Sequence, residues 1–429
     1  MSPNRLARRS VLLAGAAASL GCSRLPEEAK GRVVVPFWFA YGGKNREVLL
    51  DLVRRYHASQ RDVFIDAVFQ GDYFEALAKV RTALAAGAAP PLTHVVGEVV
   101  PYLERAGVLE PLDAYPALRA TRFVRALAQE GAYADQSGRA RVAVPFNRST
   151  PIMFVNADLL ERESVATPRT WTELHAAALR LTTRSPVRWG FVVPVSWWFW
   201  VAMMGQAGGR LVDNAGALTL GGEAGEEALR FLQRLVHDDR VMRPPPGRDY
   251  NAWSAANQDF LSGRAALLWT STAYVRYLED NASFRVVAAP LPFHVRPSVP
   301  TGGTFFVIMK AAPAEKKAAA ADFLAYMCRA DAAADFATRT GYIPVSEPAI
   351  EKLRAEGYYA RFPNDEVAVR QLEHVEPWPW SPALFRVQRD VVDPRLEDAV
   401  LRNLSPREVF AEARALAAKA LATQRRGGS

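Results

Sequence analysis

The chain has 429 residues, of which 50% are apolar and 23% are charged, and its formal net charge is +8 at pH 7. This composition excludes a disordered chain, and the length exceeds what one ordinary hydrophobic core accommodates, so we expect two domains or lobes. The basic residues are scattered among acids without a basic run, and Arg5, Arg8 and Arg9 precede the first apolar segment, so we expect no nucleic-acid binding.

The N-terminal segment is typical of an export signal, because basic residues precede the apolar run "VLLAGAAASL", which is too short to span a membrane. Arg8 and Arg9 resemble a twin-arginine signal, and "SLGC" resembles a lipobox whose cysteine, Cys22, is lipidated. We expect residues 1–22 to be a signal peptide with this cysteine. Export would bring the protein to the periplasm or the outer face of the cytoplasmic membrane. "SLGC" departs from the usual lipobox at its first two positions, so cleavage to a soluble protein is the alternative.

Cys22 and Cys328 are the two cysteines of the chain. If Cys22 carries lipid, no intramolecular disulfide is possible. We expect Cys328, in "ADFLAYMCRA", to be a small buried residue of a helix.

The first part after the signal alternates strand and helix patterns. Residues 31–39 ("GRVVVPFWF") predict a strand, "KNREVLLDLVRRYHA" a helix with one apolar face, and "DVFIDAVFQ" a second strand. "DYFEALAKVRTALAAG" predicts a helix with Phe74, Leu77 and Val80 in core register, and "PLTHVV" a buried strand. This alternation predicts an α/β lobe with a mainly parallel sheet.

The later elements continue the mixture. "VAVPFNRSTP" predicts a strand and a turn, and Thr170 with Glu173 predicts a capping box at the start of a helix. A helix is expected over residues 223–237. "NQDFLSGRAALLWTSTA" predicts a helix, a turn at Gly263 and a strand, and "TFFVIM" a further strand. "AAPAEKKAAAADFLAYMCRA" predicts a long helix, and the last hundred residues are expected to be mostly helical.

Motifs for chemistry are missing from the sequence. The six histidines form no H-x-x-x-H or H-E-x-x-H pair, and there is no G-x-S-x-G, Walker or G-x-G-x-x-G motif. We therefore expect no enzyme, no cofactor and no metal. A catalytic carboxylate pair need not be close in the sequence, so an exported hydrolase remains the alternative from another class.

Short motifs follow one another in a fixed order: "FWFAYGG", "QGDYFEALAKV", "PFNRSTPIMFVNADLL", "TPRTWTELHAAALRL", "DFLSGRAALLWTSTA", "TGGTFFVIM" and "RTGYIPVSEPA". This series resembles the extracellular solute-binding proteins of bacterial ABC importers, in the carbohydrate-type family 1. The resemblance implies an α/β, two-lobe periplasmic-binding-protein fold of class II type, with a ligand cleft between the lobes. It assigns residues 31–143 plus 300–346 to the N-terminal lobe and 146–298 plus 350–425 to the C-terminal lobe.

Within the family, "QGDY", "PFNRSTP", "TGYIPVSE" and "EGYYARFPNDEVAVRQL" are most similar to members that bind sn-glycerol 3-phosphate and glycerophosphodiesters. The resemblance implies that ten positions face the cleft: Tyr73, Glu98, Ser149, Trp197, Trp198, Ser271, Gly302, Gly303, Tyr342 and Arg389. Arg389 matches the arginine that pairs with phosphate, with Arg386 as its rival, and a guanidinium fork suits phosphate oxygens. The family's acidic contact aligns strictly with Gly97, so Glu98 would take that role from one position later.

The other positions carry their own alternatives. Either Ser271 or Thr272 could make the ligand contact at the end of the strand. The backbone N–H groups of Gly302 and Gly303 could approach an anion, since no side chain obstructs them. In "PVSWWFWVAMMG", Trp198 matches a ligand-facing tryptophan of the family, and Trp197 would take the role of a second ligand-facing tryptophan. The apolar residues after this pair are expected to fill the core.

The resemblance thus predicts a monomeric receptor that captures sn-glycerol 3-phosphate or a glycerophosphodiester such as glycerophosphocholine. It would deliver this small polar ligand to the permease subunits of an ABC importer, and contact the membrane only through the lipid anchor. Binding would shift the population from open to closed lobes. The nearest alternative is the same fold binding a neutral oligosaccharide such as maltose or trehalose.

Overall fold

The computed structural model describes residues 26–131, 140–214 and 217–426. The predicted lipid site at Cys22 and the twin-arginine pair lie outside these residues. Among the described residues, no helix is both long and apolar enough to cross a membrane.

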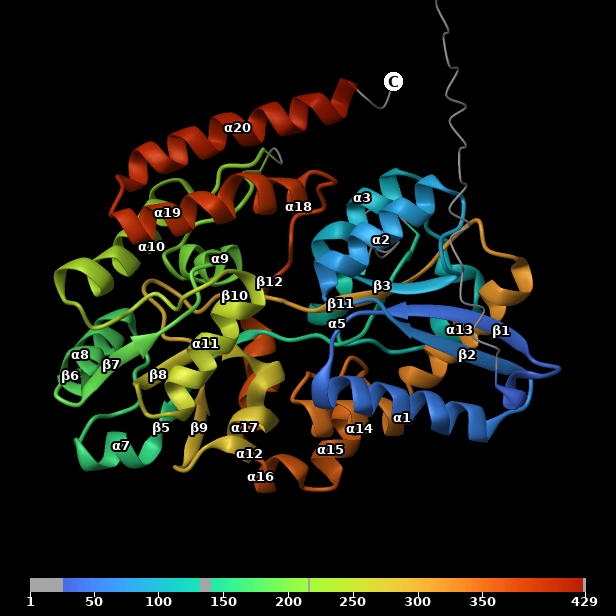
Figure 1. The fold of residues 1–429 in the computed structure, drawn as a ribbon, viewed down its shortest axis with the longest axis horizontal. Helices are drawn as coiled ribbons and strands as arrows, with labels where there is room; N and C mark the ends of the chain where they lie inside the picture. Colours follow the sequence, from blue (N-terminus) through green and yellow to red (C-terminus); the bar gives the residue numbers. More distant parts are fainter. Residues whose placement is uncertain (1–25, 132–139, 215–216, 427–429) are drawn as a thin grey trace, which may run out of the picture.

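Two five-stranded sheets form the framework, one on each side of the molecule (Figure 1). In spatial order, the first sheet contains β2 (Val63–Phe69), β1 (Val33–Phe39), β3 (Leu92–Val96), β11 (Thr304–Ile308) and β4 (Val144–Pro145). The second contains β6 (Thr183–Arg184), β7 (Val187–Val192), β8 (Ala265–Ser271), β5 (Pro151–Asn156) and β9 (Val286–Ala289). This arrangement confirms the predicted α/β two-lobe fold.

The strand directions explain how the chain links the lobes. β1 pairs parallel with β2 and β3, as the alternation predicts, whereas β11 runs antiparallel between β3 and β4. β11 joins the first sheet only after the chain has passed through the second. In the second sheet, β7 and β8 are parallel, and β5 is antiparallel to β8 and β9. A short ribbon of β10 (Val299–Pro300) and β12 (Val375–Glu376) lies between the two sheets (Figure 1).

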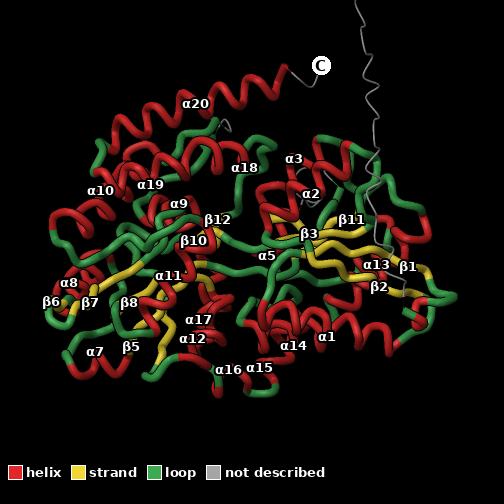
Figure 2. Tube along the Cα trace, in the orientation of Figure 1, coloured by secondary structure: helices red, strands yellow, loops and turns green. Residues whose placement is uncertain are grey.

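Helices cover both faces of the first sheet (Figure 2). They are α1 (Gly43–Ser59), α2 (Tyr73–Ala85), α3 (Val100–Arg105), α4 (Pro116–Arg119), α5 (Arg125–Ala128), α13 (Ala314–Met327) and α14 (Ala330–Thr340). Helix α1 buries one apolar face, as predicted. Helix α2 buries Leu77 and Val80, but Phe74 does not join the core: it lies in the first turn and lines a cavity. Cys328 is buried at the end of α13, which confirms that prediction.

The second sheet is covered by helices from the middle and the end of the chain. They are α7 (Ala157–Arg162), α8 (Trp171–Leu181), α9 (Trp197–Gln206), α10 (Gly222–Gln233), α11 (Asp249–Leu261), α12 (Val275–Asn281), α17 (Pro363–Arg370), α18 (Leu384–Arg386), α19 (Asp393–Arg402) and α20 (Pro406–Arg426). Thr170 caps α8 by accepting from the backbone N–H of Glu173, as predicted. The Glu173 carboxylate accepts from Arg169 rather than from Thr170, so the capping box is shifted by one residue.

The lobe boundaries stay a prediction. Helix α15 (Glu347–Ala355), which is followed by α16 (Tyr358–Arg361), packs against α14 through Ala349, Ile350 and Leu353. The segment Glu347–Ala355 therefore contacts the first lobe, and the chain reaches the second sheet only at α17, which packs on β9.

The tryptophan-rich block forms helix α9 inside the second lobe. Phe199, Val201 and Met203, which the sequence predicts to fill the core, are buried in the largest core cluster, together with Trp200. Since α9 packs against α10, β10 and β5, and Trp200 stacks on Phe410 of α20, the apolar block is explained by burial inside the lobe.

Candidate ligand-binding site

A cavity of about 850 Å³ is lined by residues from both lobes. The wall includes the start of α2, the turn after β3, the end of β8 and the segment that precedes α19. All ten residues predicted for the cleft line it: Tyr73, Glu98, Ser149, Trp197, Trp198, Ser271, Gly302, Gly303, Tyr342 and Arg389. The structure therefore brings the predicted positions together, and their part in ligand binding stays a prediction.

Two tyrosines form the polar part of the first-lobe wall. Asp72 caps α2 by accepting from the N–H groups of Phe74 and Glu75, which fixes the first turn that carries Tyr73. The Tyr73 hydroxyl accepts a hydrogen bond from the Asn147 amide and lies 3.5 Å from the Tyr342 hydroxyl. Burial raises the pKa of both phenols, so both stay neutral and keep a proton to donate.

The acidic position after β3 is Glu98. Burial raises its pKa to about 7, so the carboxyl is partly protonated at neutral pH. Gly97 is not a wall residue: a Cβ there would lie 3.1 Å from Glu130 Oε2 and 3.3 Å from the Phe305 ring. Of the two positions left open by the sequence, Glu98 is the one that reaches the cavity.

The structure gives the glycine pair a steric role, and it shows that the Gly302 N–H, predicted to approach an anion, has a backbone partner. The Gly302 N–H donates to the Ser149 carbonyl at 2.7 Å, so it does not face an anion. A Cβ at Gly302 would lie 2.7 Å from Trp198 Cζ2. Gly303 has φ of +87°, and its Cβ would lie 1.8 Å from the carbonyl oxygen of Asn147. Close backbone approach and a left-handed turn therefore require the two glycines.

The tryptophan pair divides between cavity and core. Trp198 is half-buried, and its indole N–H donates to the Thr301 carbonyl at 3.0 Å. Its ring lies 5.4 Å from that of Trp253, which also lines the cavity. Trp197 is 0% exposed and stacks on Trp378, so of the predicted pair only Trp198 exposes its ring.

Ser271 ends β8 on the wall, whereas its rival Thr272 is fully buried and does not line the cavity. The Ser271 hydroxyl accepts from the Ala273 N–H at 3.2 Å and caps the turn that follows the strand. The oxygen retains capacity for a further hydrogen bond.

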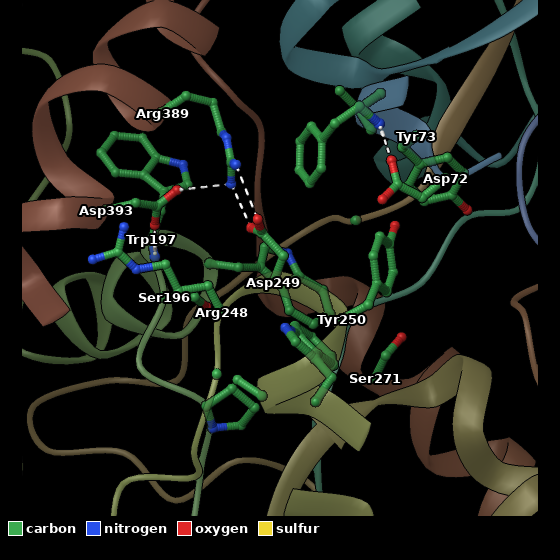
Figure 3. A pocket seen from close by; sticks show the side chains of 18 of the residues that line it. Asp72, Tyr73, Ser196, Trp197, Arg248, Asp249, Tyr250, Ser271, Arg389 and Asp393 are labelled. Carbon is green, nitrogen blue, oxygen red and sulfur yellow. Dashed lines mark hydrogen bonds and ion pairs between the residues drawn. The ribbon is translucent and has the colours of Figure 1, made fainter. Parts of the chain in front are cut away.

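Arg389 projects into the cavity from a π-helical segment, Val387–Val392 (Figure 3). Its guanidinium is already paired: Nη1 and Nη2 donate to the two carboxylate oxygens of Asp249 at 2.5 and 3.0 Å. Nη1 also lies 3.8 Å from Asp393, and the guanidinium carbon lies 4.0 Å from the centre of the Phe74 ring. Arg386, the rival position, lies outside the cavity wall.

Sequence reasoning missed the carboxylates around this arginine. Asp393 is half-buried, and partial burial raises its pKa to about 6; its carboxylate accepts from the Trp197 N–H at the start of α9. The wall carries six acidic residues but only two cationic ones, Arg248 and Arg389. The six acids are Asp72, Glu75, Glu98, Asp249, Asp393 and Glu397. The proline-rich "RPPPGRDY" before α11 was the available signal for Asp249.

Metal binding has no support in this cavity. Within the described ranges, no group of three or more His, Cys, Asp or Glu side chains could hold a metal ion. The wall provides hydroxyls, carboxyls, guanidinium groups and aromatic faces. This set of groups suits recognition of a polar small molecule.

Comparison with known proteins agrees with this geometry. Residues 51–356 match the profile of the bacterial extracellular solute-binding proteins. The sn-glycerol-3-phosphate-binding periplasmic protein UgpB of Yersinia pseudotuberculosis is 24% identical over 383 residues, covering 85% of this chain and 86% of the relative.

Solved structures show the same fold. UgpB from Mycobacterium tuberculosis in complex with glycerophosphocholine superimposes with a TM-score of 0.81 at 22% identity, over 92% of this chain and 100% of that one. The GacH receptor of Streptomyces glaucescens, studied unliganded and with acarbose, gives 0.81 at 20% identity, over 91% and 98%. The chain therefore belongs to the bacterial extracellular solute-binding protein family, and it is an exported binding component of an ABC importer, not an enzyme.

Proposed function

We propose that this receptor captures a glycerophosphodiester with a cationic headgroup, such as glycerophosphocholine. The observation that carries the proposal is the combination, on one cavity wall, of the Arg389 guanidinium with aromatic rings and with more acidic than cationic residues. A zwitterionic ligand matches both features.

The phosphate end of the ligand matches Arg389. A guanidinium donates two parallel N–H groups, and its geometry fits two oxygens of a phosphate. A diester carries one negative charge, which one arginine balances. The dianion of sn-glycerol 3-phosphate would meet the same arginine among six acidic wall residues, which favours the diester of the two glycerophosphates.

The headgroup end matches the aromatic and acidic wall. Trp198, Trp253 and Tyr274 line the cavity, and tryptophan is the ring that attracts a quaternary ammonium most strongly. Asp393 and the partly ionised Glu98 add negative charge to this wall. The hydroxyls of Tyr73 and Tyr342 supply neutral donors for the glycerol end.

A neutral oligosaccharide is the second candidate. The pairing of Arg389 with Asp249 favours it, because a sugar needs no free cation, and the fold neighbour GacH was studied with acarbose. Aromatic faces and carboxyls also suit sugar hydroxyls and C–H groups.

The remaining parts of the proposal concern delivery. Ligand contacts to both lobes would shift the population toward a closed form that the permease recognises. Attachment through a lipid on Cys22 would hold a monomeric receptor near that permease, and the twin-arginine pair would direct export.

The test is calorimetric titration of the purified protein carrying Cys22→Ser, with glycerophosphocholine, sn-glycerol 3-phosphate, maltose and trehalose. We expect glycerophosphocholine to bind most tightly and Arg389→Ala to weaken it roughly 10- to 100-fold. Arg386→Ala, which removes a positive charge three residues earlier in the chain but outside the cavity wall, is the control. Binding of a disaccharide alone, or unchanged affinity in Arg389→Ala, would overturn the proposal.

A further inference from the structure

We propose that Asp249 is an internal competitor: in the ligand-free protein its carboxylate occupies the position on Arg389 that the phosphate of the ligand takes on binding. Asp249 would thereby determine which anions the receptor accepts. The inference rests on the proposed function, because it assumes a phosphodiester at Arg389.

The geometry of the pair resembles anion recognition. Two parallel N–H groups of Arg389 reach the two oxygens of Asp249 at 2.5 and 3.0 Å. The carboxylate therefore uses the same fork that two phosphate oxygens would use. The Asp249 side chain is 40% exposed and that of Arg389 28%, so the pair lies at the cavity surface, where a ligand can reach it.

The arginine is held in place independently of Asp249. Its guanidinium stacks on Phe74 of the first lobe at 4.0 Å, and Asp393 lies 3.8 Å from Nη1. Removal of the Asp249 carboxylate would therefore leave Arg389 directed into the cavity (Figure 3).

The backbone at Asp249 has a left-handed conformation. Its φ is +47°, in the left-handed region that L-residues other than Asn and Asp rarely adopt, and Gly247 before it has φ of +87°. Helix α11 begins at this residue without a side-chain cap at Arg248. The ion pair with Arg389 is thus one of the contacts that hold the segment, and an incoming anion would release it.

The next residue connects this segment to the opposite lobe. The Tyr250 ring lies 6.1 Å from that of Tyr73 and 6.5 Å from that of Phe74. Asp249 therefore lies where the two lobes meet across the cavity. Its displacement would occur at the point where lobe closure brings both walls onto the ligand.

Anion selectivity follows from the competition. A ligand that presents only a carboxylate exchanges one carboxylate for another and gains little at Arg389. A phosphodiester that also contacts the aromatic wall gains enough elsewhere to displace Asp249. A neutral sugar does not compete for the fork.

The test is titration of glycerophosphocholine into wild type and Asp249→Asn. Asparagine adopts the left-handed conformation and has nearly the same shape, but it carries no charge. We expect affinity about three- to tenfold higher in Asp249→Asn, with unchanged affinity for maltose. Asp249→Ala, which removes the side chain altogether, should bind at least as tightly as wild type, provided that thermal unfolding shows it is folded.

Glu397→Gln is the matched control. It also removes one negative charge from the cavity wall, but Glu397 pairs with Arg248 rather than with Arg389. The inference is overturned if Glu397→Gln raises the affinity for glycerophosphocholine as much as Asp249→Asn does. It is also overturned if Asp249→Asn raises the affinity for maltose equally, because either result would attribute the effect to the net charge of the cavity.

The outcomes separate the two proposals. If wild type binds glycerophosphocholine through Arg389 but both Asp249 variants bind it no more tightly, the competition is wrong and the proposed function stands. If wild type binds no glycerophosphodiester, the proposed function is overturned and the competition with it.

Discussion

Arg148 and Glu130 form a buried ion pair, with Nη2 2.5 Å from Oε2 and only 1% and 2% of the two side chains exposed. The other Glu130 oxygen accepts from the Thr301 hydroxyl and from the Trp378 N–H. Arg148 also donates to the Gly303 carbonyl at 3.2 Å. The pair therefore links segments that are far apart in the sequence. These segments lie directly behind the cavity wall.

We expect Glu130→Ala to lower the free energy of unfolding by about 3–5 kcal/mol, because it leaves a buried guanidinium without its counter-ion. Denaturation in urea measures the change. Glu227→Ala, which removes an exposed partner of Arg230, should change stability by less than about 1 kcal/mol. A loss below 1 kcal/mol in Glu130→Ala would show that the buried pair is not needed for stability.

Gly303 and Gly263 should respond differently to substitution by alanine. Gly303→Ala combines a left-handed φ with a clash against Asn147, so we expect at least about 2 kcal/mol of destabilisation. Gly263→Ala is its control: its φ is +72°, but a Cβ there meets nothing within 4 Å, so about 1 kcal/mol is expected. Equal losses would contradict the role assigned to the close contact.

Gly302→Ala should act mainly on binding. Its Cβ would press on the Trp198 ring and on the Ser149 hydroxyl, at 2.7 and 3.0 Å, and so displace two cavity residues. We expect affinity for the receptor's ligand to fall by about tenfold or more, since a shifted aromatic contact loses about 1.4 kcal/mol or more. Calorimetric titration measures the affinity of Gly302→Ala, and an unchanged affinity would show that Trp198 does not contact the ligand.

Trp198 and Trp200 provide a comparison within one helix. Trp198 is half-buried at the cavity, whereas Trp200 is 1% exposed and donates to the Gly225 carbonyl. Trp200→Ala should cost about 3–5 kcal/mol of stability. Trp198→Ala should cost less stability but weaken ligand binding more than tenfold, by the loss of an aromatic anchor. The reverse pattern would assign Trp198 to the core.

Glu98 should give the protein a characteristic pH dependence. Its pKa is about 7 in the folded protein and near 4.5 when exposed, so the folded state holds the proton more strongly. Wild type should therefore lose stability relative to Glu98→Gln as pH rises from about 4.5 to 7, by about 1–3 kcal/mol, and no further above that. Denaturation curves at several pH values measure the difference, and a constant difference between the two proteins would refute the raised pKa.

The sequence determined the elements and the positions that converge on the cavity. Periodicity depends on neighbours within a few residues, so the apolar face of α1 and the turn at Gly263 between α11 and β8 were predictable. The order of motifs along the chain indicated the family and hence the fold. Through that resemblance alone it indicated ten residues that the fold brings to one wall.

Only the tertiary structure decided what these residues contact. Phe74 has helix-core register, but α2 begins at the cavity, so its ring lies under Arg389. The Gly302 N–H is used by Ser149, and Arg389 is neutralised by Asp249 from a distant part of the chain. Such contacts depend on how two lobes and their crossing segments come together. Local patterns in a sequence carry no information on pairing between residues brought together only by folding.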